Sequence, residues 1–189
     1  MLFITLLFIV AAGAAQQQVC SRGQSNLVIG FDDINLSPSD STSSIPWPYN
    51  DFLFVRGGAW ADKHVPVINT TGSPYFSTSA GTGPNVIITT GEALTLQQVV
   101  VNGNRTFQLL GVSLTSIFID KMGVLVQLLR NGTVVNTVSL VLPIQVRTPV
   151  SLGVPLNVDS VIIGCANQDY AYCAHIAYDD FALCYKHSK

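Results

Sequence analysis

Short runs of β-branched and other apolar residues, separated by Gly, Pro, Asn and Ser, fill most of this 189-residue chain. Helix signals are nearly absent. The sequence contains a single glutamate, Glu92, and no long stretch repeats its apolar residues with the period of about 3.6 that marks an amphipathic helix. Short strands at this spacing, with turn signals between them, predict an all-β sandwich or barrel.

The clearest strand pair surrounds an Asn-Gly dipeptide. Apolar runs at 124–130 and 133–142 flank Asn131 and Gly132. Both central residues of a type I′ turn need a positive φ, which Asn and Gly tolerate, so a β-hairpin is expected here. Further strands are expected at 53–55, 85–89, 94–101, 106–110, 113–119, 146–152, 160–165 and 175–184. Loops are expected at 37–48 and 70–84.

Two similar motifs stand near the ends of the chain, VIGFDDI at 28–34 and IAYDDFAL at 176–183. Each places two adjacent aspartates in an apolar, strand-like run, where a carboxylate is costly unless something compensates it. The four carboxylates belong to Asp32, Asp33, Asp179 and Asp180. If the two strands are neighbours, these side chains come together, and a structural Ca²⁺ is expected there because calcium prefers oxygen ligands. The alternative is two solvated Asp pairs where the chain turns.

The amino terminus predicts secretion. Residues 1–10 are nearly all apolar and residues 11–15 are small, which is the pattern of a secretory signal peptide. This stretch is shorter than the roughly 20 residues of a membrane-spanning helix, and no second stretch is apolar enough to span a bilayer. We expect cleavage after residue 14 or 15, which makes 1–15 a signal peptide and 16–189 a single secreted, extracellular domain.

Charge is scarce. Charged residues make up 11% of the chain and the net charge is −2. Without a basic patch, nucleic acid is excluded as an expected partner. N-linked glycans would supply the missing solubility, and four sequons are candidates: Asn35, Asn69, Asn104 and Asn131. The proline at position 38 weakens the first of them.

Four cysteines in a secreted chain imply two disulfides, with three possible pairings. Cys165 and Cys173 are close enough in sequence to close a short loop. That pairing leaves Cys20 with Cys184, which would join the two ends of the domain. A zinc site is the rival interpretation, but the CxxC spacing typical of such sites is absent.

Recognisable catalytic signatures are missing, among them G-x-S-x-G, H-E-x-x-H and the P-loop. An acid–base pair of Asp62 and His64 is the enzymatic alternative. A glycosidase that uses two aspartates is disfavoured because the Asp pairs are adjacent in sequence. We therefore expect a protein that is not an enzyme.

Binding has better support from the aromatic residues. Sugar-binding surfaces use exposed aromatic rings as apolar platforms and Asn, Asp or Gln to bind hydroxyls. The candidates in or beside loops are Trp47, Tyr49, Trp60 and Tyr75. The alternative for Tyr49 and Trp60 is that they are core residues at the end of the sandwich.

The order of several motifs resembles the carbohydrate-binding-module-like (galactose-binding-like) jelly rolls of secreted proteins, including bacterial extracellular proteins sorted by exosortases. The motifs are FDDI at 31–34, YNDF at 49–52, GAW at 58–60, SAGTGPN at 79–85, NVDSVI at 157–162 and YDDF at 178–181. The resemblance implies a two-sheet antiparallel sandwich whose first and last strands are neighbours. It also implies a structural Ca²⁺ near the aspartates of those strands. The four cysteines depart from the bacterial members.

These observations predict a secreted, non-catalytic, all-β jelly-roll sandwich that binds carbohydrate or an extracellular glycoprotein or surface component. The alternative is a structural protein that self-associates in an extracellular matrix, coat or fibre. Low charge and β-branched strands would favour such edge-to-edge association.

Overall fold

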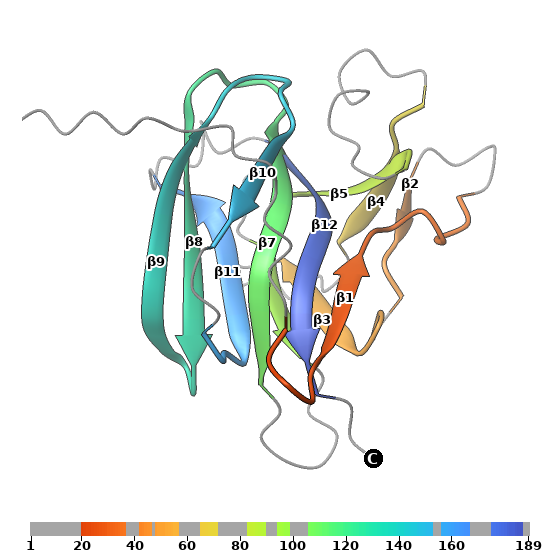
Figure 1. Ribbon diagram of the computed structural model, residues 1–189. Helices are drawn as coiled ribbons and strands as arrows, with labels where there is room; N and C mark the ends of the chain where they lie inside the picture. Colours follow the sequence, from red (N-terminus) through yellow and green to blue (C-terminus); the bar gives the residue numbers. More distant parts are fainter. Residues whose placement is uncertain are drawn as a thin grey trace, which may run out of the picture.

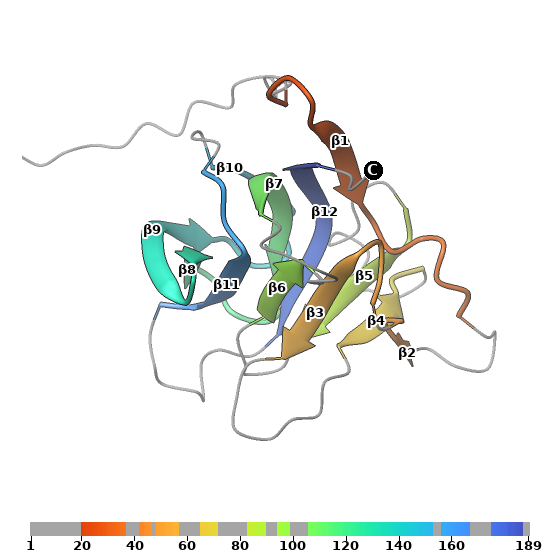
Figure 2. The ribbon, with the colours of Figure 1, turned by 90° about the horizontal axis from the view of Figure 1, so that it is seen from below.

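The computed structural model describes residues 20–36, 42–46, 48–56, 65–71, 83–89, 94–98, 106–152, 156–166 and 175–186. Within these ranges the chain forms twelve strands in two antiparallel sheets. Seen along the sandwich in Figure 2, the two sheets face each other. No helix of the described part is long and apolar enough to cross a membrane.

The first six strands are short. They are β1 (Ser25–Ile29), β2 (Thr42–Ser44), β3 (Phe52–Arg56), β4 (Pro66–Asn69), β5 (Asn85–Thr89) and β6 (Leu94–Gln98). The last six include the longest strands. They are β7 (Phe107–Ser116), β8 (Met122–Arg130), β9 (Thr133–Leu142), β10 (Thr148–Ser151), β11 (Ser160–Cys165) and β12 (Ile176–Tyr185).

The strand order is that of a jelly roll. The larger sheet has the order β10-β7-β12-β5-β4-β2, with β1 also paired with β12, and the smaller sheet has the order β3-β6-β11-β8-β9 (Figure 1). The eight strands from β5 to β12 therefore form two four-stranded sheets, β5-β12-β7-β10 and β6-β11-β8-β9. This is the double Greek key of a jelly roll. The predicted two-sheet antiparallel jelly-roll sandwich is confirmed.

The core lies between the sheets. Along β8 buried and half-buried residues alternate, because alternate side chains of a strand point to opposite faces. Phe31, Phe54 and Phe181 meet at the centre, with ring centroids 5.4–6.2 Å apart and near-perpendicular ring planes. Such edge-to-face contacts are favourable beyond the area that they bury. These contacts pack Phe31, which follows β1, and Phe181, in the middle of β12, into one aromatic cluster with Phe54.

Two local predictions have different outcomes. The Asn-Gly turn is confirmed, since Asn131 and Gly132 have φ values of 50° and 72° and join β8 to β9. The two strands expected at 106–110 and 113–119 are instead the single strand β7. Gly111, which separates the two expected strands, lies inside β7 and does not form a turn. A Cβ there would lie 2.7 Å from the carbonyl oxygen of Val150, so glycine permits the close approach of β10.

Candidate functional site

The second aspartate motif lies where β12 changes its neighbour. The first half of β12 pairs with β5 from Ile176 to Tyr178, and the second half pairs with β1 from Phe181 to Tyr185. Figure 1 shows β5 and β1 along the same edge of β12. The register with β7 shifts between Asp179 and Ala182, which marks a β-bulge. The first and last described strands, β1 and β12, therefore meet at this point, as the motifs predict.

The first aspartate motif forms a turn rather than a strand. The Asp32 carboxylate accepts a hydrogen bond of 3.0 Å from the backbone N–H of Asn85, at the start of β5. The Asn85 side chain donates to the carbonyl oxygens of Phe31 and Ile34, both at 3.2 Å. A Cβ at Gly83 would overlap the end of the Asp32 side chain, so a larger residue there would require the Asp32 carboxylate to move. These contacts hold the turn against β5.

Tyr49 fastens the other side of the turn. Its hydroxyl lies 2.9 Å from the carbonyl oxygen of Gly30 and also contacts the carboxylate of Asp33, and its single proton is donated to one of these two acceptors or shared between them. Tyr49 is 7% exposed, and its ring stacks on that of Phe31 with ring centroids 5.7 Å apart. Burial, followed by the hydrogen bond to Asp33, raises the pKa of the Tyr49 phenol well above its usual value. The hydroxyl therefore stays protonated and remains a donor.

A tight turn presents Asn50 beside Tyr49. Tyr49 and Phe52 exchange backbone hydrogen bonds of 2.9 Å, and the two residues between them, Asn50 and Asp51, have φ values of 49° and 65°. This is the backbone of a two-residue type I′ hairpin turn, which Asn and Asp tolerate. Asn50 is exposed. The turn thus carries its side chain to the surface next to the aspartate turn.

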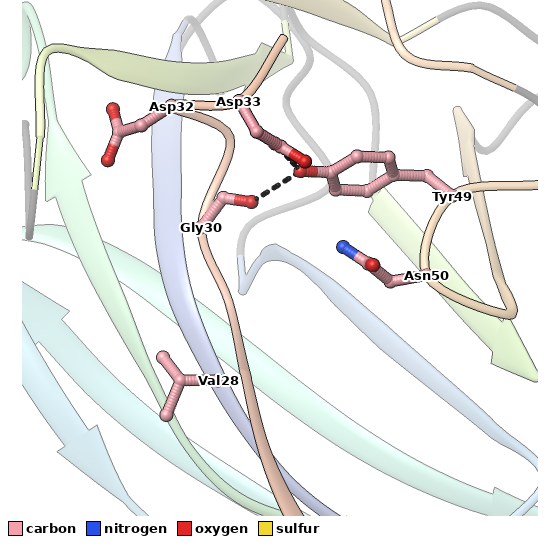
Figure 3. A pocket seen from close by; sticks show the side chains of 6 residues that line it. All are labelled: Val28, Gly30, Asp32, Asp33, Tyr49 and Asn50. Atoms are coloured by element: carbon pink, nitrogen blue, oxygen red, sulfur yellow. Dashed lines mark hydrogen bonds between the residues drawn. The ribbon is translucent and has the colours of Figure 1, made fainter.

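These elements enclose a shallow hollow of about 270 Å³, shown in Figure 3. It is lined by Val28, Gly30, Asp32, Asp33, Tyr49 and Asn50. Asp32, Asp33 and Asn50 are exposed, so carboxylate and amide groups border the opening. Such a lining offers hydrogen-bond acceptors with one amide donor, which suits a hydroxyl-rich ligand or a cation. We call this the aspartate pocket.

The four aspartates of the two motifs do not gather at one point. Asp32 and Asp33 line the aspartate pocket, whereas Asp179 is fully buried and Asp180 is ion-paired with Arg147. Among the residues that the structure describes, no three His, Cys, Asp or Glu side chains form a group that could hold a metal ion. The expected Ca²⁺ at all four aspartates therefore stays a prediction.

The aromatic candidates are placed only in part. Tyr49 borders the aspartate pocket with its hydroxyl, but its ring is buried, so it is a core residue rather than an exposed platform. Trp47, Trp60 and Tyr75 lie outside the described residues, as do Asp62 and His64. Sequence reasoning missed Asn50. The signal for it was the Asn-Asp pair between two aromatic residues, which is typical of a two-residue hairpin turn.

The disulfide Cys20–Cys184 joins the residues before β1 to β12, as expected, with Cα atoms 5.5 Å apart. Cys165 is also disulfide-bonded, and its expected partner, Cys173, lies outside the described residues. The first bridge fixes β1 beside β12 close to the chain ends. It therefore supports the strand pair that leads into the aspartate pocket.

Three sequons fall on described residues. Asn131 is exposed at the tip of the β8–β9 hairpin, and Asn35 is exposed after the first aspartate motif. Asn69 is half-buried at the end of β4, and its side-chain oxygen accepts a hydrogen bond of 2.7 Å from the Thr71 N–H. Asn104 lies outside the described residues. Glycosylation at each of them stays a prediction.

The strand order and the aspartate pocket define a jelly-roll β-sandwich with a polar hollow where its two ends meet. No family model and no curated protein matches the sequence. Three of the similar solved structures are an arabinose-bound GH51 α-L-arabinofuranosidase and two mutants of the family 29 carbohydrate-binding module CBM29-2, complexed with cellulohexaose and with mannohexaose.

The arabinofuranosidase match has a TM-score of 0.46 at 14% identity and covers 69% of this chain but only 23% of the enzyme. The cellulohexaose complex has a TM-score of 0.36 at 11% identity and covers 89% of this chain and 95% of that module. The mannohexaose complex has a TM-score of 0.35 at 9% identity and covers 87% of this chain and 94% of that module.

Proposed function

We propose that this chain is a secreted, non-catalytic β-sandwich that binds carbohydrate at the aspartate pocket. The observation that carries the proposal is that Asp32, Asp33 and Asn50, three exposed polar residues, line one open hollow. Carboxylate and amide groups are the side chains that recognise sugar hydroxyls. An extracellular location is supported by the disulfide Cys20–Cys184, because such bonds persist in oxidising compartments.

A non-catalytic role is supported by the arrangement of the two pocket carboxylates. Asp32 accepts from the Asn85 N–H and Asp33 is hydrogen-bonded to Tyr49, so each is engaged in holding the turn. A glycosidase instead places two carboxyl groups on either side of the bond that it cleaves. Adjacent residues in one turn suit ligand binding better than this chemistry.

The proposal includes Ca²⁺ at the same pocket, held by Asp32 and Asp33 rather than by all four aspartates. Its support is the donor set: Asp32, Asp33, Asn50 and Gly30 all line the hollow, and their carboxylate, amide and backbone groups include the oxygen ligands that calcium prefers. Asp180 has its own counter-ion in Arg147 and is not needed. Bound calcium would supply positive charge for sugar hydroxyls.

The test is glycan-array binding of the secreted protein, with calcium and with a chelator. The pocket variant is Asn50→Gly, which removes the amide while glycine tolerates the positive φ. The matched control is Lys121→Gly, another exposed residue with a positive φ, on the β7–β8 turn. We expect binding to one class of sugar that Asn50→Gly weakens about tenfold, the value of one lost hydrogen bond to a charged or polar ligand group, and that Lys121→Gly leaves unchanged.

Each failure has its own meaning. Binding that persists equally in Asn50→Gly would place the sugar elsewhere and overturn the pocket. Binding that is indifferent to the chelator would overturn the calcium part. An array without any binding in either condition would overturn the carbohydrate proposal as a whole.

A further inference from the structure

The exposed apolar residues of the described chain gather around β9. Of the seven large hydrophobic residues that are exposed, six lie on β9, on the loop after it or on the β7–β8 turn. They are Val134, Val135, Val141, Ile144, Val146 and Phe118. β9 is also an edge strand, because it pairs with β8 and no other described strand pairs with it (Figure 1). A long apolar edge is a template for pairing with another chain.

Among the described residues, no strand pairs with the outer edge of β9, so its outward-pointing backbone groups have no strand partner there. In an antiparallel pair, alternate residues turn their N–H and C=O groups away from the partner strand. The register of β8 with β9 skips Val135, which is the extra residue of a β-bulge. Arg130 and Thr133 close the Asn-Gly turn and bond to each other, and the alternation resumes after the bulge with Asn136 bonded to Leu128. The residues of β9 beyond the bulge whose N–H and C=O groups point away from β8 are therefore Thr137, Ser139 and Val141.

Only part of this edge is open to a partner. The Thr137 N–H donates a hydrogen bond of 2.9 Å to the side-chain oxygen of Asn136 and is therefore already satisfied. At the other end, Pro143 has no N–H to donate. The open window between them consists of the backbone groups of Ser139 and Val141, with Leu140 at its centre. Thr137 and Pro143, on either side of this window, have no N–H group to donate to a pairing strand.

We propose that β9 pairs antiparallel with β9 of a second copy of this chain, about a two-fold axis at Leu140. Ser139 of one copy then lies opposite Val141 of the other, and the two residues exchange their free N–H and C=O groups. The window is complementary to itself, because residues without a free N–H, Thr137 and Pro143, also lie opposite each other. The smaller sheets of two copies become one continuous sheet.

The charge pattern allows a second copy as the partner, for which the self-complementary window argues. From Gly132 to Val146 the chain has no charged residue, so two copies meet without like-charge repulsion. Leu140 is half-buried and packs against the core, and in the pair it lies opposite the same residue of the other copy. Pairing thus extends the hydrophobic core across the two-fold axis. The inference is independent of the carbohydrate proposal, because β9 contributes no residue to the aspartate pocket.

The test is sedimentation velocity of the secreted protein over a range of concentrations. The proposal expects a monomer–dimer equilibrium. Ser139→Pro removes an outward N–H while leaving the ladder to β8 intact, so this variant should fold and stay monomeric. Val141→Lys brings like charges into the contact and should do the same. Val134→Lys is the matched control, because Val134 is also exposed but lies outside the window, and its dimer should persist.

Cross-linking tests the register. Leu140→Cys places two thiols opposite each other across the two-fold axis, so oxidation should give a covalent dimer. Circular dichroism melts establish that each variant is folded. A wild-type protein that is monomeric at every concentration would overturn the proposal, as would dimers unaffected by Ser139→Pro. Assemblies larger than a dimer would also overturn it, because a two-fold contact consumes the edge that forms it.

Discussion

Arg147 and Asp180 form an ion pair, with the guanidinium Nη2 2.5 Å from the carboxylate Oδ2, at the bulge where β12 changes its neighbour from β5 to β1. Asp180 has a φ of 48°, so it occupies the left-handed region that few residues other than Gly, Asn and Asp accept. Asp180 therefore both adopts the backbone conformation that the bulge needs and supplies the carboxylate that pairs with Arg147. This relationship leads to the first prediction.

Asp180→Asn should lower the free energy of unfolding by about 0.5 kcal/mol, because it removes a partly exposed ion pair and keeps a residue that tolerates positive φ. Asp180→Ala should lower it by about 2 kcal/mol, because alanine also resists the left-handed backbone. Urea denaturation measures both values. Asp180→Gly serves as the control for the backbone and should resemble Asn. An alanine variant as stable as the asparagine variant would contradict the role of the bulge.

Asn85→Ala should destabilise the chain by about 2 kcal/mol. The Asn85 side chain is buried and donates to the carbonyl oxygens of Phe31 and Ile34, which would lose those donors inside the protein. Asn26→Ala is the control, because Asn26 is exposed on β1, and its effect should stay within about 0.5 kcal/mol. Thermal melts of the two variants give the comparison. Equal losses would show that the turn does not depend on Asn85.

Removal of the Cys20–Cys184 bridge by a double alanine substitution should cost about 4 kcal/mol. The bridge spans 164 residues, and the entropy that a cross-link removes from the unfolded chain grows with the length of the loop. The double substitution Cys165→Ala and Cys173→Ala removes the short predicted bridge and should cost less, about 2 kcal/mol. Guanidinium unfolding without reductant measures both. The reverse order would contradict this argument.

His175 should make stability depend on pH in the acidic range. Burial lowers the pKa of its imidazole below the usual 6.5, and the ring packs edge-on against Phe118 with centroids 4.8 Å apart. The unfolded chain therefore binds more protons than the folded chain between the two pKa values. Stability then rises with pH through that window and is lost as pH falls below 6.5.

The comparison is with His175→Asn, which cannot titrate and still tolerates the positive φ of 68° at this position. Urea midpoints measured on both sides of pH 6.5 should fall more steeply on acidification in the wild type than in the variant. Parallel profiles would exclude His175 as a source of the dependence.

Sequence reasoning reached the strands that have a strong pattern and missed those that do not. The β8–β9 hairpin followed from its Asn-Gly turn and its apolar runs. In contrast, the Ser- and Pro-rich segment at 37–48 was expected to be a loop, yet Thr42–Ser44 forms β2 and pairs with β4. A three-residue strand of polar residues carries no alternation, so only its partner reveals it.

The aspartate motifs illustrate the same division at the site. Their sequence predicted that the two ends of the chain meet, and the pairing of Ile29 with Phe181 places them together. The separation of these carboxylates did not follow from the sequence. It depends on a bulge in β12 and on Arg147, which binds Asp180 and lies 33 residues from it in the sequence. Asn50 lines the pocket because it lies on the turn between Tyr49 and Phe52, and only the fold places this turn beside the first aspartate motif.

The sequence by itself determined the all-β class, the hairpin turn and the meeting of the chain ends, because strand alternation, turn residues and the cost of apolar aspartates act locally. Tertiary structure alone decided which aspartates face solvent, which strand edge stays open and where the polar hollow forms. Those features arise where segments distant in sequence pack together, and a one-residue bulge or a single close approach of two backbones is enough to redirect a side chain.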